Sequence, residues 1–237
     1  MRISSGNKDL DEWLNGGYEN DIITVLYGPA GSGKTNLCVL AAVEQAKQGK
    51  KVIFIDTEGG FSAERIRQID ENAGKNIFLL KAVKFYEQSQ LINRLLAQIT
   101  KNVSLIIVDS IAMLYRLEAS IAREKGGDKI RIINMTLAKQ LRILSEIARK
   151  KNIPIIVTDQ VYSDFIRSDE LKSLEEKKVY MVGGDLMKYW AKCIIELQKQ
   201  KEGKRKAILR KHRSLPEKEF SFIINNKGIE KAGFKLF

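Results

Sequence analysis

The sequence is poor in the residues that build metal sites and cross-links, with two cysteines and one histidine among 237 residues. Neither Cys38 nor Cys193 has a second Cys or His at metal-ligand spacing, which excludes a zinc module. We expect both cysteines to be small core residues rather than a disulfide. His212 lies in a basic run and nothing in the sequence pairs it with a metal or a nucleophile.

Long hydrophobic runs are also missing. No stretch of about 18 apolar residues is present that would span a membrane. Residues 1–6 lack the apolar segment of a signal peptide. There is no internal repeat, low-complexity tract or linker. We therefore expect an intracellular, cytoplasmic protein with no membrane partner, folded as one domain over residues 1–237.

Acidic residues are outnumbered by basic ones, 29 against 41, which gives a net charge of +12. This balance favours a polyanionic partner, with nucleic acid ahead of an anionic membrane. The alternative is a Lys-rich solvated surface of the kind common in proteins from hot environments. A hydrophobic content of 44% is sufficient for a large core.

Apolar strands and amphipathic helices alternate along the chain, which predicts an α/β fold with a mainly parallel sheet covered on both faces. Strands are expected at 22–27, 52–55, 77–80, 103–108 and 153–158, with helices at 36–48, 63–72, 88–100 and 132–151. After residue 190 the pattern changes to strands joined by turns, at 191–197, 206–211 and 219–224, which predicts an antiparallel extension of the sheet. Residues 116–129 and 162–184 lack clear periodicity and are interpreted as two long functional loops.

The most informative segment is residues 28–35, which fit the phosphate-binding pattern G-x-x-x-x-G-K-[ST] between an expected strand and an expected helix. In such a loop backbone N–H groups cradle phosphate oxygens, the lysine reaches the β- and γ-phosphates, and the hydroxyl binds Mg²⁺. The alternative is a Gly-rich turn that happens to precede Lys-Thr. The sequence therefore predicts that ATP and Mg²⁺ are bound by Gly28, Pro29, Ala30, Gly31, Ser32, Gly33, Lys34, Thr35 and Asn36.

Three polar groups follow other buried strands at the same expected edge of the sheet. Asp109 ends an apolar strand and is predicted to hold Mg²⁺ with Thr35; the alternative is a strand-end Asp that caps a turn. Glu58 is the candidate that orients the attacking water; the alternative is a helix cap. Gln160 is the candidate γ-phosphate sensor at the start of the second loop; the alternative is a structural turn.

Five segments together resemble the RecA/RadA recombinase superfamily over nearly the whole chain. They are SSGNKDLD at 4–11, IDTEGGF with ER at 55–65, VDSIAMLYR at 108–116, VTDQV at 157–161 and VGG at 182–184. The resemblance implies a RecA-type ATPase fold, with Lys34, Glu58 and Gln160 as catalytic residues and Arg65 beside the nucleotide. It also implies that the two long loops contact DNA.

Within the superfamily the chain is most similar to the RadB family, short paralogues of RadA, and we expect it to lack the N-terminal helical DNA-binding domain and the linker motif of RadA. The resemblance implies a DNA repair and homologous recombination accessory protein. Such a protein binds ATP and DNA, assists the RadA recombinase and hydrolyses ATP weakly. The alternative is an active DNA-dependent ATPase that forms filaments and exchanges strands. A KaiC-like regulator is a third option, against which the DTEGGF and VDSIAMLYR matches argue.

The chain departs from the RadA pattern at two places. Ser62 and Ala63 stand where the family has Arg and Pro, and lower nucleotide affinity is the expected consequence. Lys211 and Arg213 replace the acidic residue that caps a neighbour's ATP. We hypothesise that these two cations reach the γ-phosphate of an adjacent subunit in a homo-oligomer. The alternative is that they bind DNA phosphate or remain solvated.

Basic residues concentrate in three segments that are candidates for DNA contact, preferably with single strands. Residues 199–213 hold eight Lys or Arg and one acid and are expected to form part of a basic face; a Lys-guarded edge strand is the alternative. Binding is expected to be salt-sensitive and sequence-tolerant because phosphate contacts dominate. The DNA contacts named for the two loops are Arg123, Lys125, Lys129, Arg167 and Lys172.

Overall fold

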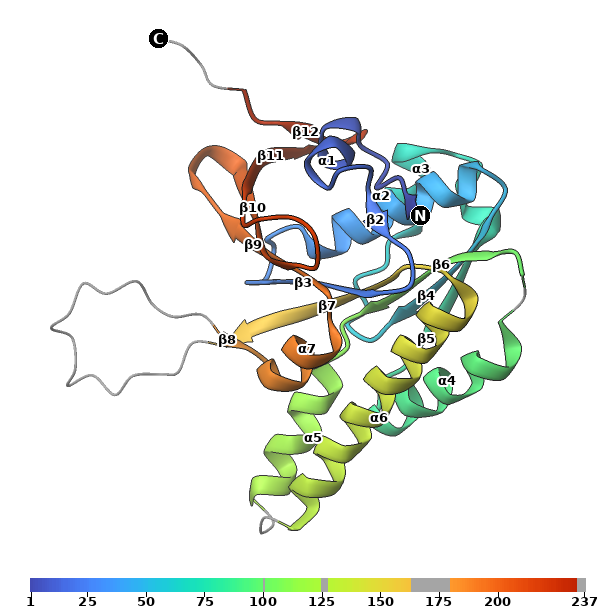
Figure 1. Cartoon of the computed structure of the whole chain (residues 1–237), viewed down its shortest axis with the longest axis vertical. Helices are drawn as coiled ribbons and strands as arrows, with labels where there is room; N and C mark the ends of the chain where they lie inside the picture. The colour runs from blue at the N-terminus through green and yellow to red at the C-terminus, as the bar shows by residue number, and fades with distance from the viewer. Residues whose placement is uncertain (100, 125–127, 163–179, 234–237) are drawn as a thin grey trace, which may run out of the picture.

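The computed structural model describes residues 1–99, 101–124, 128–162 and 180–233, and its centre is one mixed sheet of 10 strands (Figure 1). The strand order is β12-β11-β10-β9-β3-β7-β6-β4-β5, with β8 paired to β7. The parallel strands are β3 (Ile23–Gly28), β4 (Lys51–Asp56), β5 (Ile77–Lys81), β6 (Val103–Asp109), β7 (Ile155–Tyr162) and β9 (Cys193–Lys199). The antiparallel ones are β8 (Tyr180–Met181), β10 (Lys204–His212), β11 (Glu219–Asn225) and β12 (Gly228–Lys231).

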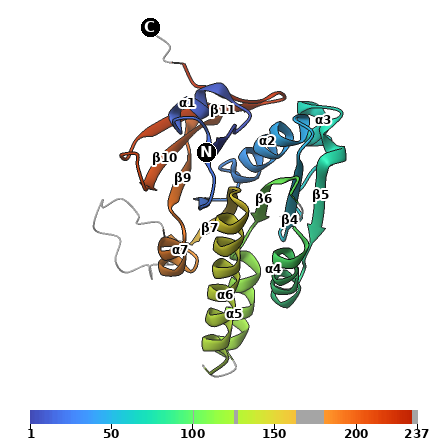
Figure 2. The same ribbon diagram turned by 45° about the vertical axis from the view of Figure 1, so that its right-hand side comes forward.

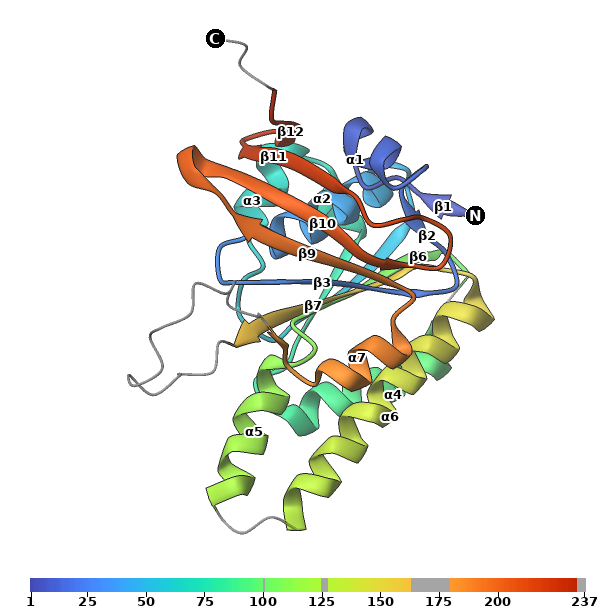
Figure 3. The ribbon, with the colours of Figure 1, turned by 60° about the vertical axis from the view of Figure 1, so that its left-hand side comes forward.

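Helices cover both faces of the sheet, as the continuous apolar strands predict (Figure 3). One face packs against α1 (Lys8–Trp13), α2 (Lys34–Lys47) and α3 (Ala63–Ile69). The other packs against α4 (Phe85–Gln98), α5 (Met113–Glu124), α6 (Asp128–Lys151) and α7 (Gly184–Trp190). The predicted α/β class is confirmed. Cys38 and Cys193 are free and buried, as expected.

The predicted antiparallel extension is present, with three refinements. Strand β9 pairs parallel with β3 and antiparallel with β10, so it joins the two halves of the sheet. Strand β12 lies in a segment for which no strand was expected. Strand β10 lies between β9 and β11. The alternative interpretation of its lysines as guards of an exposed edge is therefore wrong.

The interpretation of residues 116–129 as a long loop is wrong for the residues that the structure describes. Helix α5 runs to Glu124 and α6 begins at Asp128, so the two form a helical hairpin that projects from the body (Figure 2). Leu114, Ala119 and Ala122 face the core, and these small or aliphatic side chains give α5 its packing face. The charged residues between them concealed this helical spacing.

The helix expected at 63–72 ends earlier, at Ile69, because the Asp70 carboxylate accepts hydrogen bonds from the backbone of Asn72 and Ala73 at 2.9 Å each. This turn leads into the short 3₁₀ helix η1 (Ala73–Asn76); a second, η2 (Lys201–Gly203), forms the β9–β10 turn. Two short strands, β1 (Arg2–Ile3) and β2 (Tyr18–Glu19), pair separately. No helix in the described ranges is long and apolar enough to cross a membrane.

Candidate nucleotide-binding site

The P-loop leaves the carboxyl end of β3 and enters α2, the strand–loop–helix context that the motif requires. Gly33 caps the helix at φ +105° with no side-chain cap, which leaves its N-terminal N–H groups to other acceptors. Within the described residues the N–H groups of Gly31 and Gly33 donate to no protein acceptor. The Ser32 hydroxyl is buried and also lacks a partner there. The loop thus presents donors without acceptors, as an anion site does.

Lys34 is buried at the start of α2. Its ammonium donates to the carbonyls of Gly28 and Pro29 at 2.8 and 3.1 Å, so it folds back over the loop. Burial lowers its pKa, while the charges of Glu58 and Asp109 oppose this shift. The cation is therefore held inside the loop with less water than a surface lysine has.

Asp109 ends β6 and faces the P-loop, as predicted. One of its carboxylate oxygens accepts from the Thr35 hydroxyl at 2.7 Å, and the other accepts a short hydrogen bond from the Thr158 hydroxyl. Burial raises the pKa of Asp109, and the two hydroxyls counter part of that shift. Thr158 was not predicted as part of the site. The only signal for it in the sequence is its position in the same strand, two residues before Gln160.

Glu58 and Gln160 meet although 102 positions separate them in the chain. The Gln160 amide nitrogen lies 3.0 Å from both carboxylate oxygens of Glu58. Asp56 shapes the turn that presents Glu58, because its carboxylate accepts from four successive backbone N–H groups, those of residues 58–61. Burial, followed by the charge of Asp109, raises the pKa of Glu58.

These side chains fit Mg²⁺ and ATP. Thr35 and Asp109 are an oxygen pair of the type that Mg²⁺ prefers, with one carboxylate and one hydroxyl in contact. The unpartnered donors of the loop suit phosphate oxygens. The carboxylates of buried Asp109 and exposed Glu58 have raised pKa values and interact with the Lys34 charge, and a divalent cation would offset their negative charge.

Comparison with known proteins agrees with this geometry. A family model described as Rad51 matches residues 1–232. The chain belongs to the Rad51 family. It is 41% identical over 225 residues to the DNA repair and recombination protein RadB of Methanocaldococcus jannaschii, covering 93% of this chain and 98% of that protein. It is 39% identical to the RadB of Methanobrevibacter smithii over 232 residues, covering 94% and 93%.

A solved structure described as the crystal structure of the RadB recombinase matches with a TM-score of 0.77 and 34% identity. The match covers 98% of this chain and 100% of that one. The predicted resemblance to RadB and to the recombinase superfamily is confirmed, and so is the fold. The roles of individual residues in this Rad51-family chain stay predictions.

The departure at Ser62 and the position of Arg65 have a structural explanation. Ser62 caps α3, with its hydroxyl accepting from the Arg65 backbone at 3.1 Å. The Arg65 guanidinium donates to Asn36 at 3.0 Å and to the carbonyls of Asn225, Asn226 and Gly228 in the β11–β12 turn. Arg65 therefore joins α3 to this turn beside the P-loop helix, and its role as a nucleotide ligand stays a prediction.

Lys211 and Arg213 lie at the opposite edge of the sheet from their own P-loop, because β10 runs antiparallel to β9. The Lys211 ammonium donates to the Lys188 carbonyl at 2.6 Å. Arg213 forms ion pairs with Glu19 at 2.9 Å and Asp21 at 2.7 Å, which raise its pKa. These contacts exclude action on their own chain's P-loop. The hypothesis that they act on a neighbour's ATP stays a prediction. For Arg213 to do so, its ion pairs with Glu19 and Asp21 would have to break.

The predicted DNA contacts are only partly visible. Arg123 lies near the end of α5, and Lys129 near the start of α6, so both sit at the tip of the helical hairpin. Lys125, Arg167 and Lys172 lie outside the described residues. The same hairpin exposes four large apolar side chains, Leu117, Ile121, Ile132 and Met135.

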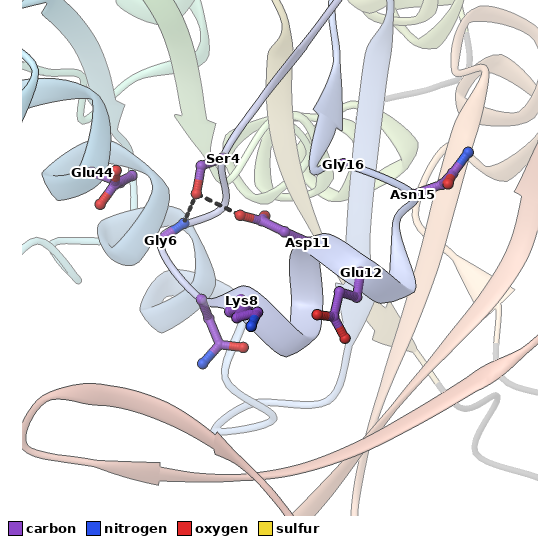
Figure 4. A pocket seen from close by; sticks show the side chains of 9 residues that line it. Ser4, Gly6, Lys8, Asp11, Glu12, Asn15, Gly16 and Glu44 are labelled. Atoms are coloured by element: carbon purple, nitrogen blue, oxygen red, sulfur yellow. Dashed lines mark hydrogen bonds between the residues drawn. The ribbon is translucent and has the colours of Figure 1, made fainter.

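A hollow of about 700 Å³ lies away from this site, between the N-terminal segment and α1. Figure 4 shows the Ser4 hydroxyl between the Gly6 backbone and the Asp11 carboxylate, with hydrogen bonds of 3.1 and 2.5 Å. Glu44, late in α2, lines the same hollow, far along the helix from the P-loop. The two hydrogen bonds of the Ser4 hydroxyl hold the N-terminal turn in place.

Asp159 precedes Gln160 and is fully buried, with neither carboxylate oxygen hydrogen-bonded to a partner in the described part of the chain. Burial raises its pKa well above the ordinary value. A raised folded-state pKa means that stability is lost as pH rises through that pKa. Asp159→Asn is therefore expected to stabilise the protein by roughly 1–3 kcal/mol at pH 8, and less as pH falls toward 4.

This expectation is checked by thermal unfolding of both proteins between pH 4 and pH 8. The matched control is Glu71→Gln at an exposed position, which should leave the unfolding temperature unchanged. Equal unfolding temperatures for Asp159→Asn and wild type at pH 8 would show that the buried carboxyl carries no such cost.

Proposed function

We propose that this Rad51-family chain is an accessory protein of DNA repair and homologous recombination. It binds Mg-ATP and DNA, single strands favoured, assists the RadA recombinase and hydrolyses ATP slowly. The relatives named above are called DNA repair and recombination proteins, which supports the biological setting. The P-loop donors and the Thr35–Asp109 pair support the nucleotide.

The contact between Gln160 and Glu58 carries the proposal most directly. An amide that donates to both oxygens of the carboxylate engages the group that would orient the attacking water. When ATP is bound, the γ-phosphate offers Gln160 a competing acceptor. Gln160 lies two residues before the end of β7 at Tyr162, so a change of its hydrogen-bond partner would act on the end of this strand.

Slow hydrolysis follows from the same arrangement. Bound Mg²⁺ would supply charge neutralisation across the phosphates, with Thr35 and Asp109 as its protein ligands. Glu58 must exchange its bonds with Gln160 for a bond to water before it acts as a base. Arg213 is paired with Glu19 and Asp21, so the charge that would stabilise the transition state from a neighbour is engaged elsewhere.

DNA binding is supported by the charge of +12 and by the basic tip of the α5–α6 hairpin. Arg123 and Lys129 are the described residues proposed to contact phosphate there. A RadA recombinase and further copies of this chain are the proposed protein partners. The alternative is an active DNA-dependent ATPase that forms filaments, favoured by the presence of both Glu58 and Gln160.

ATP turnover with and without single-stranded DNA separates the two candidates. We expect a turnover well below one per minute, raised less than about tenfold by DNA, and lowered further in Glu58→Gln. Nucleotide affinity should be retained in Glu58→Gln because the P-loop is untouched. The control is Glu64→Gln, an exposed acid in α3. Strong stimulation by DNA that Glu58→Gln abolishes would establish the filament-forming ATPase instead.

A further inference from the structure

Two cations of the β9–β10 hairpin lie against the P-loop. Lys199 and Arg205 are directly paired across the two antiparallel strands, so their side chains share one face of the sheet. A Cβ placed on Gly31 would lie 3.0 Å from the Lys199 ammonium nitrogen. One placed on Gly33 would lie 3.4 Å from Cδ and 3.7 Å from Nε of Arg205. Both side chains therefore reach the middle of the phosphate-binding loop from their own chain.

These cations differ from four other basic residues of the same run, which have acidic partners; Lys201 and Lys211 also form no ion pair in the described part of the chain. Lys204, Lys206, Arg210 and Arg213 each form an ion pair with a carboxylate. Within the described ranges Lys199 and Arg205 form none. Arg205 donates through one terminal nitrogen to the Gly203 carbonyl at 2.6 Å, and its Nε is buried without a hydrogen-bond partner.

Like charges placed directly opposite each other on two strands repel. A buried guanidinium N–H without an acceptor adds a further cost. Both costs disappear if an anion sits between the two cations and the loop. The loop itself supplies unpartnered N–H groups at the same place, those of Gly31 and Gly33. The charge of the hairpin and the donors of the loop therefore point to one anion.

We propose that Lys199 and Arg205 bind the diphosphate part of the nucleotide in cis, as additional phosphate ligands beside Lys34. The inference rests on the proposed nucleotide binding. The middle of a P-loop surrounds the α- and β-phosphates, so these side chains contact the part that ATP and ADP share. The basic run of residues 199–213 is thereby divided: its first part serves the chain's own nucleotide, while Lys211 and Arg213 lie at the far edge of the sheet.

The test is nucleotide binding by calorimetry for ATP, ADP and AMP. The variants are Lys199→Gln and Arg205→Gln, which remove the positive charge and keep most of each aliphatic stem. Each substitution is expected to weaken the binding of ATP and of ADP by the same factor, roughly 5- to 30-fold, because one charge-assisted contact to phosphate is lost. The matched control is Lys201→Gln in the intervening turn, expected within twofold of wild type.

Unfolding temperatures of the variants close to that of wild type show that the loss is not caused by misfolding. If the wild type binds ATP and ADP and the Lys199→Gln and Arg205→Gln variants bind them with the same affinity, the inference is wrong while the proposed nucleotide binding stands. A loss confined to single-stranded DNA binding would also overturn it and assign the pair to DNA. If the wild type binds neither ATP nor ADP, the proposed function fails and the inference fails with it.

Discussion

Lys34→Ala is expected to weaken ATP binding at least 100-fold. The ammonium is the one lysine charge of the P-loop itself, and it is buried over the loop within bonding distance of the Gly28 and Pro29 carbonyls. Its loss would also leave the negative charges of Glu58 and Asp109 without their nearest described cation inside the loop. Phosphate binding would then rest on backbone N–H groups and the two proposed cations of the β9–β10 hairpin, in a site whose own carboxylates repel the ligand.

Equilibrium binding of ATP, followed by calorimetry or by a fluorescent analogue, measures this effect. The matched control is Lys47→Ala, an exposed lysine at the other end of the same helix, with unchanged affinity expected. The unfolding temperature of Lys34→Ala should equal or exceed that of wild type, because burial already penalises the lysine charge in the folded state. An affinity within threefold of wild type would contradict the assignment of the loop.

Gly28→Ala is expected to lower the free energy of unfolding by about 3 kcal/mol or more, and with it the unfolding temperature by roughly 6–12 °C. A Cβ at Gly28 would lie 2.2 Å from the Leu197 backbone oxygen and 3.0 Å from the Ser32 hydroxyl oxygen. The backbone of β9 thus passes directly beside the first residue of the P-loop. Neither backbone can withdraw without breaking the pairing of β3 with β9.

Thermal or denaturant unfolding measures the loss. Gly49→Ala is the control, since Gly49 also has a positive φ of +74° but no atom within 4 Å of the added Cβ. It is expected to cost only about 1 kcal/mol, the backbone penalty without the clash. Equal losses for the two variants would show that the close approach of β9 is not what requires glycine at position 28.

The sequence alone was sufficient to predict where the polar groups of the site converge. Glu58, Asp109 and Gln160 each follow an apolar strand, and parallel strands place their carboxyl ends at one edge of a sheet. The structure bears this out in two direct contacts, Thr35 with Asp109 and Gln160 with Glu58. Short-range patterns sufficed because each residue is fixed by its own strand.

The contributions that escaped prediction depend on pairing between distant segments. Lys199 reaches the loop only because β9 pairs with β3 in a particular register. Arg213 is neutralised by Glu19 and Asp21, nearly two hundred positions away. Residues 116–129, which hold most of α5 and the start of α6, are predicted as a loop because few large apolar residues mark the inner face of α5. No local sequence pattern predicts these contacts between distant segments.

We propose that the nucleotide site acts as a switch through Gln160. The most direct test of this proposal is the affinity for single-stranded DNA, at fixed salt, without nucleotide, with ADP and with a non-hydrolysable ATP analogue. We expect single-stranded DNA to bind at least fivefold more tightly with the analogue than in the other two states, and this difference to be lost in Gln160→Ala. The same affinity in all three states, for a protein that demonstrably binds the analogue, would contradict it.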